Sequence, residues 1–199
     1  MKLILDFDDV LFNNTKGLKI KIFEVLARHG IVNSESAYLR KREGNEPFSL
    51  INFLHEIIAT QGVAGVNEQE LYEEISESFS GLLNEPLLAL IRDMKISRDD
   101  CFIVTSGEKK YQEDKIEGSG ITRIFNVARI VDHSKKLEVE KICRDFPEDE
   151  IIFVDDKEKF FRELDMEACS NLKTVLYNEH GLENLKAEIE ESKRQESNV

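Results

Sequence analysis

The sequence predicts an α/β protein in which helices cover both faces of a parallel sheet. Short apolar runs that are typical of buried strands alternate with helical segments in the C-terminal half of the chain. Most of these runs end in acidic or hydroxyl residues. A long helical stretch separates the first run from the second, which indicates a helical insertion into the α/β domain.

The predicted strands are five apolar runs, at residues 3–6, 101–104, 127–131, 151–154 and 172–177. Helical patterns fill most of the chain between the later runs, at residues 109–117, 136–146 and 157–166. Parallel strands need a long crossover, and a helix usually supplies it. The alternation therefore predicts a parallel sheet rather than a set of hairpins.

Residues 15–95 have a helical pattern throughout. Pro47 and Pro86 are placed to begin helices, and Asn67 precedes Glu70 in the pattern of a capping box. We therefore divide the chain into a discontinuous core, a cap and a polar C-terminal tail, at residues 1–14 with 96–185, 15–95 and 186–199. Ligands of open parallel sheets bind beyond the carboxyl ends of the strands, so a cap inserted there would act as a lid.

Composition limits the classes of partner. The chain has 199 residues, 41% of them hydrophobic, which is enough for one sizeable core, and its net charge is −13. Such an excess of acid disfavours nucleic acid and anionic membranes, but a divalent cation would still allow a small phosphorylated substrate. The apolar N-terminal run is too short for a signal peptide, which predicts a cytoplasmic protein. We expect a monomer, because no apolar stripe outside the predicted core requires a partner.

Polar residues gather where the predicted strands end. If the strands are neighbours, these residues converge at one edge of the sheet. They are Asp6, Asp8 and Asp9 after the first strand, Thr105, Ser106 and Gly107 after the second, Lys135 and Lys136 after the third, and Asp155 and Asp156 after the fourth.

This set of residues suits phosphoryl transfer. Carboxylates in such proximity repel one another unless a cation is present, and as hard oxygen ligands they suit Mg²⁺. The Asp6 carboxylate can attack phosphorus, and Asp8 can protonate a leaving alkoxide and later activate water. A lysine would offset the charge on the phosphoryl group, while Thr105 and the turn amides after it can hold phosphoryl oxygens.

Four segments also resemble, in order, the four motifs of the haloacid dehalogenase (HAD) superfamily. They are LILDFDDVL at 3–11, FIVTSG at 102–107, a segment from Gly120-Ile121 to Lys135, and IIFVDD at 151–156. The resemblance covers residues 1–177. It implies a Rossmann-like three-layer core with a helical cap between the first two motifs.

The resemblance also implies residue roles. Asp6 would be the nucleophile and Asp8 the acid and base. Mg²⁺ would be held by Asp6, the backbone carbonyl of Asp8 and Asp156, with Asp155 assisting directly or through water. Lys135 fits the third motif better than Lys136, because the apolar residues after it fall at the expected helical spacing.

The chain departs from the family pattern at two positions. Asp9 stands where many members have a small residue, and we interpret it as structural or outer-sphere. Phe160 stands where related motifs often carry an acid or an amide, which predicts one fewer supporting metal contact. In the cap, the basic run Arg40-Lys41-Arg42 is either a solvated helix surface or an anion clamp for the substrate.

The function implied is that of a Mg²⁺-dependent phosphatase acting on a small phosphorylated metabolite through an aspartyl phosphate. A phosphomutase and a catalytically weak HAD-like binding protein remain alternatives. A dehalogenase has no need of a proton donor at Asp8. In a signalling receiver module the lysine would follow the last strand of the set, whereas here it precedes Asp155. The cap sequence does not define the substrate.

Overall fold

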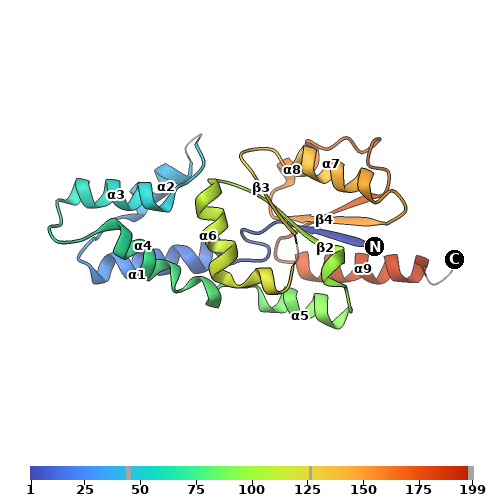
Figure 1. The fold of residues 1–199 in the computed structure, drawn as a ribbon, viewed down its shortest axis with the longest axis horizontal. Coiled ribbons are helices and arrows are strands. Elements are labelled where there is room, and N and C mark those ends of the chain that lie inside the picture. Colours follow the sequence, from blue (N-terminus) through green and yellow to red (C-terminus); the bar gives the residue numbers. More distant parts are fainter. Residues whose placement is uncertain (44–45, 126, 197–199) are drawn as a thin grey trace.

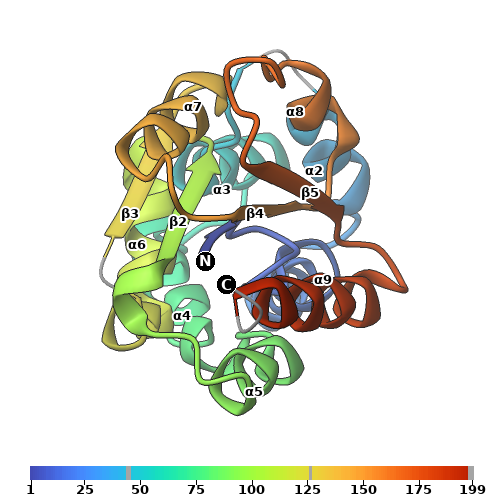
Figure 2. The same cartoon turned by 90° about the vertical axis from the view of Figure 1, so that its right-hand side faces the viewer.

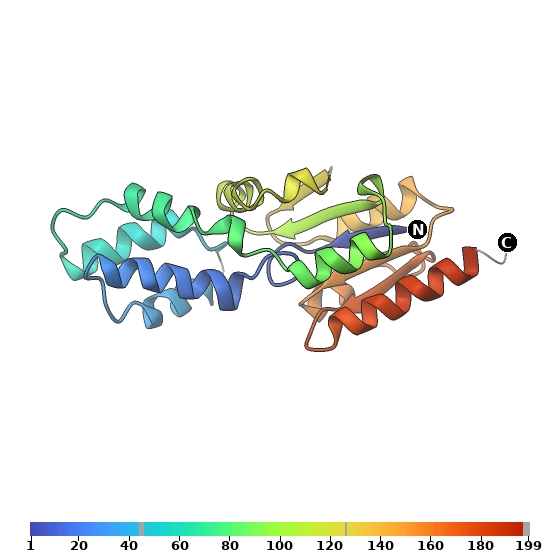
Figure 3. The same ribbon diagram turned by 90° about the horizontal axis from the view of Figure 1, so that it is seen from below.

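The computed structural model describes residues 1–43, 46–125 and 127–196. A sheet domain and a helical lobe lie end to end along the longest axis of the molecule (Figures 1 and 3). The helical lobe is formed by the insertion that follows the first strand. Within the described residues, no helix is both long and apolar enough to cross a membrane.

Over the described residues, the sheet has five parallel strands in the order β3-β2-β1-β4-β5. β1 lies at the centre, where Leu5 pairs with Ile103 of β2 and with Val154 of β4. The strands are β1 (Lys2–Leu5), β2 (Cys101–Ser106), β3 (Val127–Val131), β4 (Ile151–Asp155) and β5 (Leu172–Leu176). The predicted α/β class and parallel sheet are confirmed.

Helices cover both faces of the sheet. Because successive side chains of a strand point to opposite faces, each strand contributes apolar residues to the packing on both sides. Leu3 and Leu5 pack in one apolar cluster with residues of α5, α6 and α9, whereas Ile4 packs in a second cluster with residues of α7 and α8 (Figure 2). These helices are α5 (Glu85–Asp93), α6 (Lys109–Ser119), α7 (Lys136–Asp145), α8 (Glu158–Arg162) and α9 (Gly181–Glu196). Two 3₁₀ turns join the core elements, η3 (Arg98–Asp100) and η4 (Ile121–Arg123).

The helical lobe, here called the cap, contains four α-helices in the part of it that the structure describes. Asn67 begins the last of them as expected from the sequence, since its side chain accepts from the amide of Gln69 at 2.7 Å. The elements are the π-helical turn η1 (Asn14–Leu18), α1 (Lys19–Arg28), α2 (Glu35–Arg42), α3 (Leu50–Gln61), α4 (Glu68–Ser76) and the 3₁₀ turn η2 (Phe79–Gly81).

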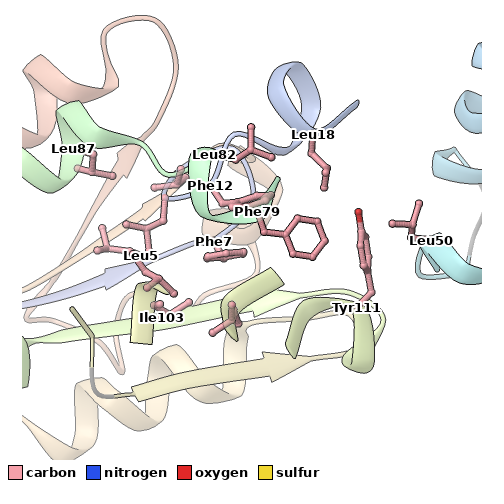
Figure 4. Close-up of a cluster of buried hydrophobic side chains, with 14 of the residues drawn as sticks. Leu5, Phe7, Phe12, Leu18, Leu50, Phe79, Leu82, Leu87, Ile103 and Tyr111 are labelled. Atoms are coloured by element: carbon pink, nitrogen blue, oxygen red, sulfur yellow. The ribbon is translucent and has the colours of Figure 1, made fainter. Parts of the chain in front are cut away.

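The two chain segments that join the cap to the core run side by side. The amide of Asn13 donates to Leu82 O and the amide of Asn84 donates to Leu11 O, both at 2.8 Å. Phe12 belongs to the first of these segments, and its ring stacks on that of Phe7 at 5.0 Å between ring centroids (Figure 4). The cap is therefore anchored close to the carboxyl end of β1.

The structure differs from the expected domain division at two places. Helix α5 falls within the predicted cap, but it packs beside α9 on the sheet domain (Figure 2). Residues 186–196 were expected in a polar tail, and they instead extend α9. Leu185, Ile189 and Ser192 recur at helical spacing and are buried, so this part of the helix docks on the core. Residues 197–199 of the expected tail lie outside the described residues.

Candidate active site

The candidate site is centred on a buried lysine between two carboxylates. Asp6 directly follows β1 and Asp155 ends β4, its neighbour in the sheet. Lys135, at the start of α7, places Nζ 2.6 Å from Asp6 Oδ1 and 2.6 Å from Asp155 Oδ2. The exposed fractions of Asp6, Lys135 and Asp155 are 2%, 1% and 0%. Each carboxylate therefore has a cation beside it in a region that excludes water.

A group of three carboxylates could hold a metal ion. One oxygen each from Asp6, Asp155 and Asp156 lies within 4.8 Å of the others. Burial, with the charges of Asp6 and Asp155, raises the pKa of Asp156 to about 7 against the opposing charge of Lys157, whose Nζ lies 3.4 Å from Asp156 Oδ1. Asp156 Oδ1 is buried without a hydrogen-bond partner among the described residues. Hard oxygen donors crowded in this way fit a hard cation such as Mg²⁺, which is the ion expected from the sequence.

The carboxylate of Asp8 turns toward α6. Its Oδ1 lies 2.5 Å from Lys115 Nζ, and its Oδ2 accepts from Gln112 Nε2 at 2.8 Å. Burial alone would raise the pKa of Asp8, but the Lys115 ammonium and the two hydrogen bonds hold it below its usual range. Neither Gln112 nor Lys115 is among the site residues predicted from the sequence.

The residues at the carboxyl end of β2 lie at the same edge of the sheet. Thr105 is fully buried, and its Oγ1 has no hydrogen-bond partner among the described residues, so it can donate to a substrate oxygen. Gly107 uses its amide within the sheet, where it donates to Val131 O at 3.0 Å. In this conformation Thr105 is therefore better placed than the Gly107 amide to meet a phosphate. Ser106 lies between them as the last residue of β2.

The structure also places three residues whose roles were uncertain from the sequence, namely Lys136, Asp9 and Phe160. Lys136 points away from the site, with Nζ 3.6 Å from Glu140, so the geometry favours Lys135 as the motif lysine. Asp9 has a φ of 62° and accepts from the amide of Thr15 at 2.7 Å, which ties it to the start of the cap. The ring centroid of Phe160 lies 4.4 Å from Lys135 Nζ, so this residue contacts the lysine as an aromatic face.

The basic run of the cap is divided between two environments. Lys41 Nζ pairs with Glu56 at 2.5 Å, and the Arg42 guanidinium lies over the Phe48 ring at 5.5 Å from its centroid. All three basic residues of the run are exposed. Lys41 thus forms an ion pair within the cap, so Arg40 and Arg42 are the candidates for a substrate anion clamp.

Replacing Asp156 by asparagine should stabilise the metal-free protein above pH 7. The pKa of about 7 lies above the ordinary value of 3.8, so the folded state binds more protons between about pH 4 and pH 7. The free energy of unfolding therefore falls as pH rises through this range, and the variant avoids that loss. We expect a gain of about 1 kcal/mol or more in EDTA, or about 2–4 °C in Tm.

Thermal unfolding of both proteins with EDTA and with Mg²⁺ measures this effect. Mg²⁺ should raise the Tm of the wild type and have a smaller effect on the variant. Asp132→Asn, which removes an exposed carboxylate after β3, is the matched control. A variant that melts below the wild type in EDTA would show that the negative charge of Asp156 does not destabilise the metal-free protein.

Comparisons with known proteins identify the fold. No family model matches the sequence, and no curated protein matches it. A haloacid dehalogenase-like hydrolase from Burkholderia xenovorans superposes with a TM-score of 0.65 at 18% identity, over 90% of this chain and 83% of that one. The HAD-hydrolase YfnB from Bacillus subtilis, bound to magnesium, gives 0.60 at 15% identity, over 94% and 97%.

A β-phosphoglucomutase-like protein from Thermotoga maritima gives a TM-score of 0.56 at 14% identity, over 94% of this chain and 99% of that one. All three likenesses extend over the sheet domain and the cap together, because each covers at least 90% of the chain. With its parallel sheet, its inserted cap and the motif residues at the strand ends, the chain has the fold of the HAD-like hydrolases.

Proposed function

We propose that the protein is a Mg²⁺-dependent phosphatase that hydrolyses a small phosphomonoester through an aspartyl phosphate on Asp6. The observation that carries the proposal is the position of Asp6. It is a buried carboxylate at the end of the central strand, with Lys135 on one oxygen and two further carboxylates within metal-sharing distance. A carboxylate needs such a positive environment to approach a phosphate dianion.

The metal would be held by Asp6, Asp156 and the backbone carbonyl of Asp8, with Asp155 in direct or water-mediated contact. When bound, Mg²⁺ would offset negative charge on the transferring phosphoryl group. Lys135 supplies a second positive charge at Asp6, and Asp155 keeps that ammonium in place by accepting from it at 2.6 Å. The Thr105 hydroxyl would donate to a phosphoryl oxygen.

The reaction has two steps. In the first, Asp6 Oδ attacks phosphorus, the bond from phosphorus to the leaving oxygen breaks, and that oxygen takes a proton from the protonated form of Asp8. The approach of the phosphate dianion would favour that form, because a second negative charge opposes ionisation of the carboxyl group. In the second, water attacks the phosphorus of the aspartyl phosphate and gives a proton to Asp8, which releases inorganic phosphate and restores Asp6. Asp8 therefore acts as the acid first and as the base afterwards.

The burial of Asp6 and Lys135 supports a cap that opens to admit the substrate and closes for the reaction. The structure of the B. subtilis neighbour is described as revealing interdomain movement, and that movement belongs to that protein. We also expect a cytoplasmic monomer, and the net charge of −13 disfavours a nucleic-acid or membrane partner.

A phosphomutase is the second candidate, and the likeness to the T. maritima protein favours it. In a mutase the phosphoryl group on Asp6 would pass back to a substrate hydroxyl instead of to water. The cap would decide between the two outcomes by controlling the access of water to the aspartyl phosphate.

Hydrolysis of p-nitrophenyl phosphate, with Mg²⁺ and with EDTA, tests the proposal. The phosphatase predicts release of p-nitrophenol and inorganic phosphate in equal amounts, and loss of both in EDTA. Turnover that is the same in EDTA would contradict the metal dependence. Transfer of phosphate to an added sugar phosphate, with little inorganic phosphate released, would identify the mutase instead.

A further inference from the structure

Helix α6 binds both carboxylate oxygens of Asp8. Lys115 Nζ lies 2.5 Å from Oδ1, and Gln112 Nε2 donates to Oδ2 at 2.8 Å. The exposed fractions of Lys115 and Gln112 are 0% and 3%, so neither competes with solvent for the carboxylate. A carboxylate with both oxygens bound by buried donors is fixed in one rotamer.

The surroundings of Lys115 direct it to Asp8. Asp8 is its one ion-pair partner among the described residues. Three aromatic rings also lie near its ammonium, with Nζ 4.6 Å from the ring centroid of Tyr111, 5.7 Å from that of Phe12 and 5.9 Å from that of Phe7. Burying an ammonium among rings is costly unless a carboxylate pairs with it, so this arrangement depends on Asp8.

Gln112 joins the turn after β2 to the same carboxylate. Its Nε2 also donates to Ser106 O at 3.2 Å. A Cβ added at Gly107 would lie 2.7 Å from Gln112 Nε2, so any larger residue at this position would collide with the side-chain amide of Gln112. The second motif, α6 and Asp8 therefore form one packed unit.

The same helix contacts the cap. Tyr111 packs against Phe48 at 5.8 Å between ring centroids, and Tyr72 donates to Asp114 Oδ2 at 2.5 Å. Figure 4 shows Tyr111 on α6 between the core cluster and Leu50 of the cap. The helix that holds Asp8 is thus also the helix on which the cap rests.

We propose that Gln112 and Lys115 are positioning residues, which hold the Asp8 carboxylate where it exchanges a proton with the leaving group and with water. This inference rests on the proposed phosphatase function. The competing explanation is that the Asp8–Lys115 pair only stabilises the fold. The two explanations differ in how the loss of each residue depends on the leaving group.

The test compares kcat/KM for p-nitrophenyl phosphate and for phenyl phosphate, which have similar shapes. p-Nitrophenolate departs with little proton assistance, whereas phenolate is more basic and depends on the acid. In Gln112→Leu and Lys115→Met, kcat/KM for phenyl phosphate should fall about tenfold or more beyond its fall for p-nitrophenyl phosphate. Lys115→Arg should recover part of this difference, because it keeps a donor and a charge.

The matched control is Lys109→Met, which removes an exposed lysine from the same helix and should leave the ratio of the two substrates unchanged. Equal losses for both substrates in a normally folded Gln112→Leu would overturn the inference. If Lys115→Met does not fold, Gln112→Leu and Lys115→Arg decide the question. A wild type that hydrolyses neither substrate with Mg²⁺ would overturn the phosphatase proposal and this inference together, whereas an active wild type with unchanged ratios would overturn this inference alone.

Discussion

Replacing Asp6 by asparagine is expected to lower kcat for p-nitrophenyl phosphate by about 10⁴-fold or more, with little change in Tm. The amide keeps the shape of the side chain, but it cannot attack phosphorus, so the covalent route is lost. Lys135 still has Asp155 as a partner at 2.6 Å, so the buried ammonium stays paired in the variant. The fold should therefore survive the substitution.

Kinetic assays and melting curves of the wild type, Asp6→Asn and Asp132→Asn measure this prediction. Asp132→Asn, at an exposed aspartate, should behave as the wild type in both measurements. An Asp6→Asn protein that melts normally and keeps more than about a tenth of wild-type kcat would show that Asp6 is not the nucleophile.

Replacing Lys135 by methionine is expected to lower both stability and activity. Asp6 and Asp155 would then be buried without their shared cation, which we expect to cost about 3–5 kcal/mol of the free energy of unfolding in EDTA. Mg²⁺ should restore part of this loss, because it brings positive charge to the same carboxylates. Turnover should fall about 10²-fold or more, because a positive charge beside the reacting phosphoryl group is lost.

Urea unfolding with EDTA and with Mg²⁺ measures the stability effect. Lys136→Met is the matched control, because Lys136 is the next residue, is exposed, and pairs with Glu140 outside the site. A Lys135→Met protein as stable and as active as Lys136→Met would show that the buried lysine has neither role.

The strands and the site at their ends were predictable because their signals are local. A strand buried on both faces is a short apolar run, and each predicted run overlaps a strand of the structure within about two residues at either end. Residues at the carboxyl ends of neighbouring parallel strands must also meet at one edge. Asp6 and Asp155, which are far apart in sequence, come together for this reason.

The role of α6 was not predictable, because its sequence resembles a solvated helix. Gln112 and Lys115 are types of residue that usually face water, and only the packed structure shows both to be buried. The one sequence signal was position, since they share a face with Tyr111 and Ile116. Helix α5 was assigned to the cap for a related reason, because an apolar stripe does not state which neighbour it packs against.

The residue that receives the phosphoryl group is the most direct evidence for or against the covalent mechanism. The wild type is mixed with p-nitrophenyl phosphate and Mg²⁺, quenched in acid within the first turnover, digested and mapped by mass spectrometry. The aspartyl-phosphate mechanism predicts one phosphoryl group on the peptide that contains Asp6, sensitive to hydroxylamine and absent from Asp6→Asn. Turnover without any phosphorylated peptide, or a phosphoryl group on another residue, would contradict it.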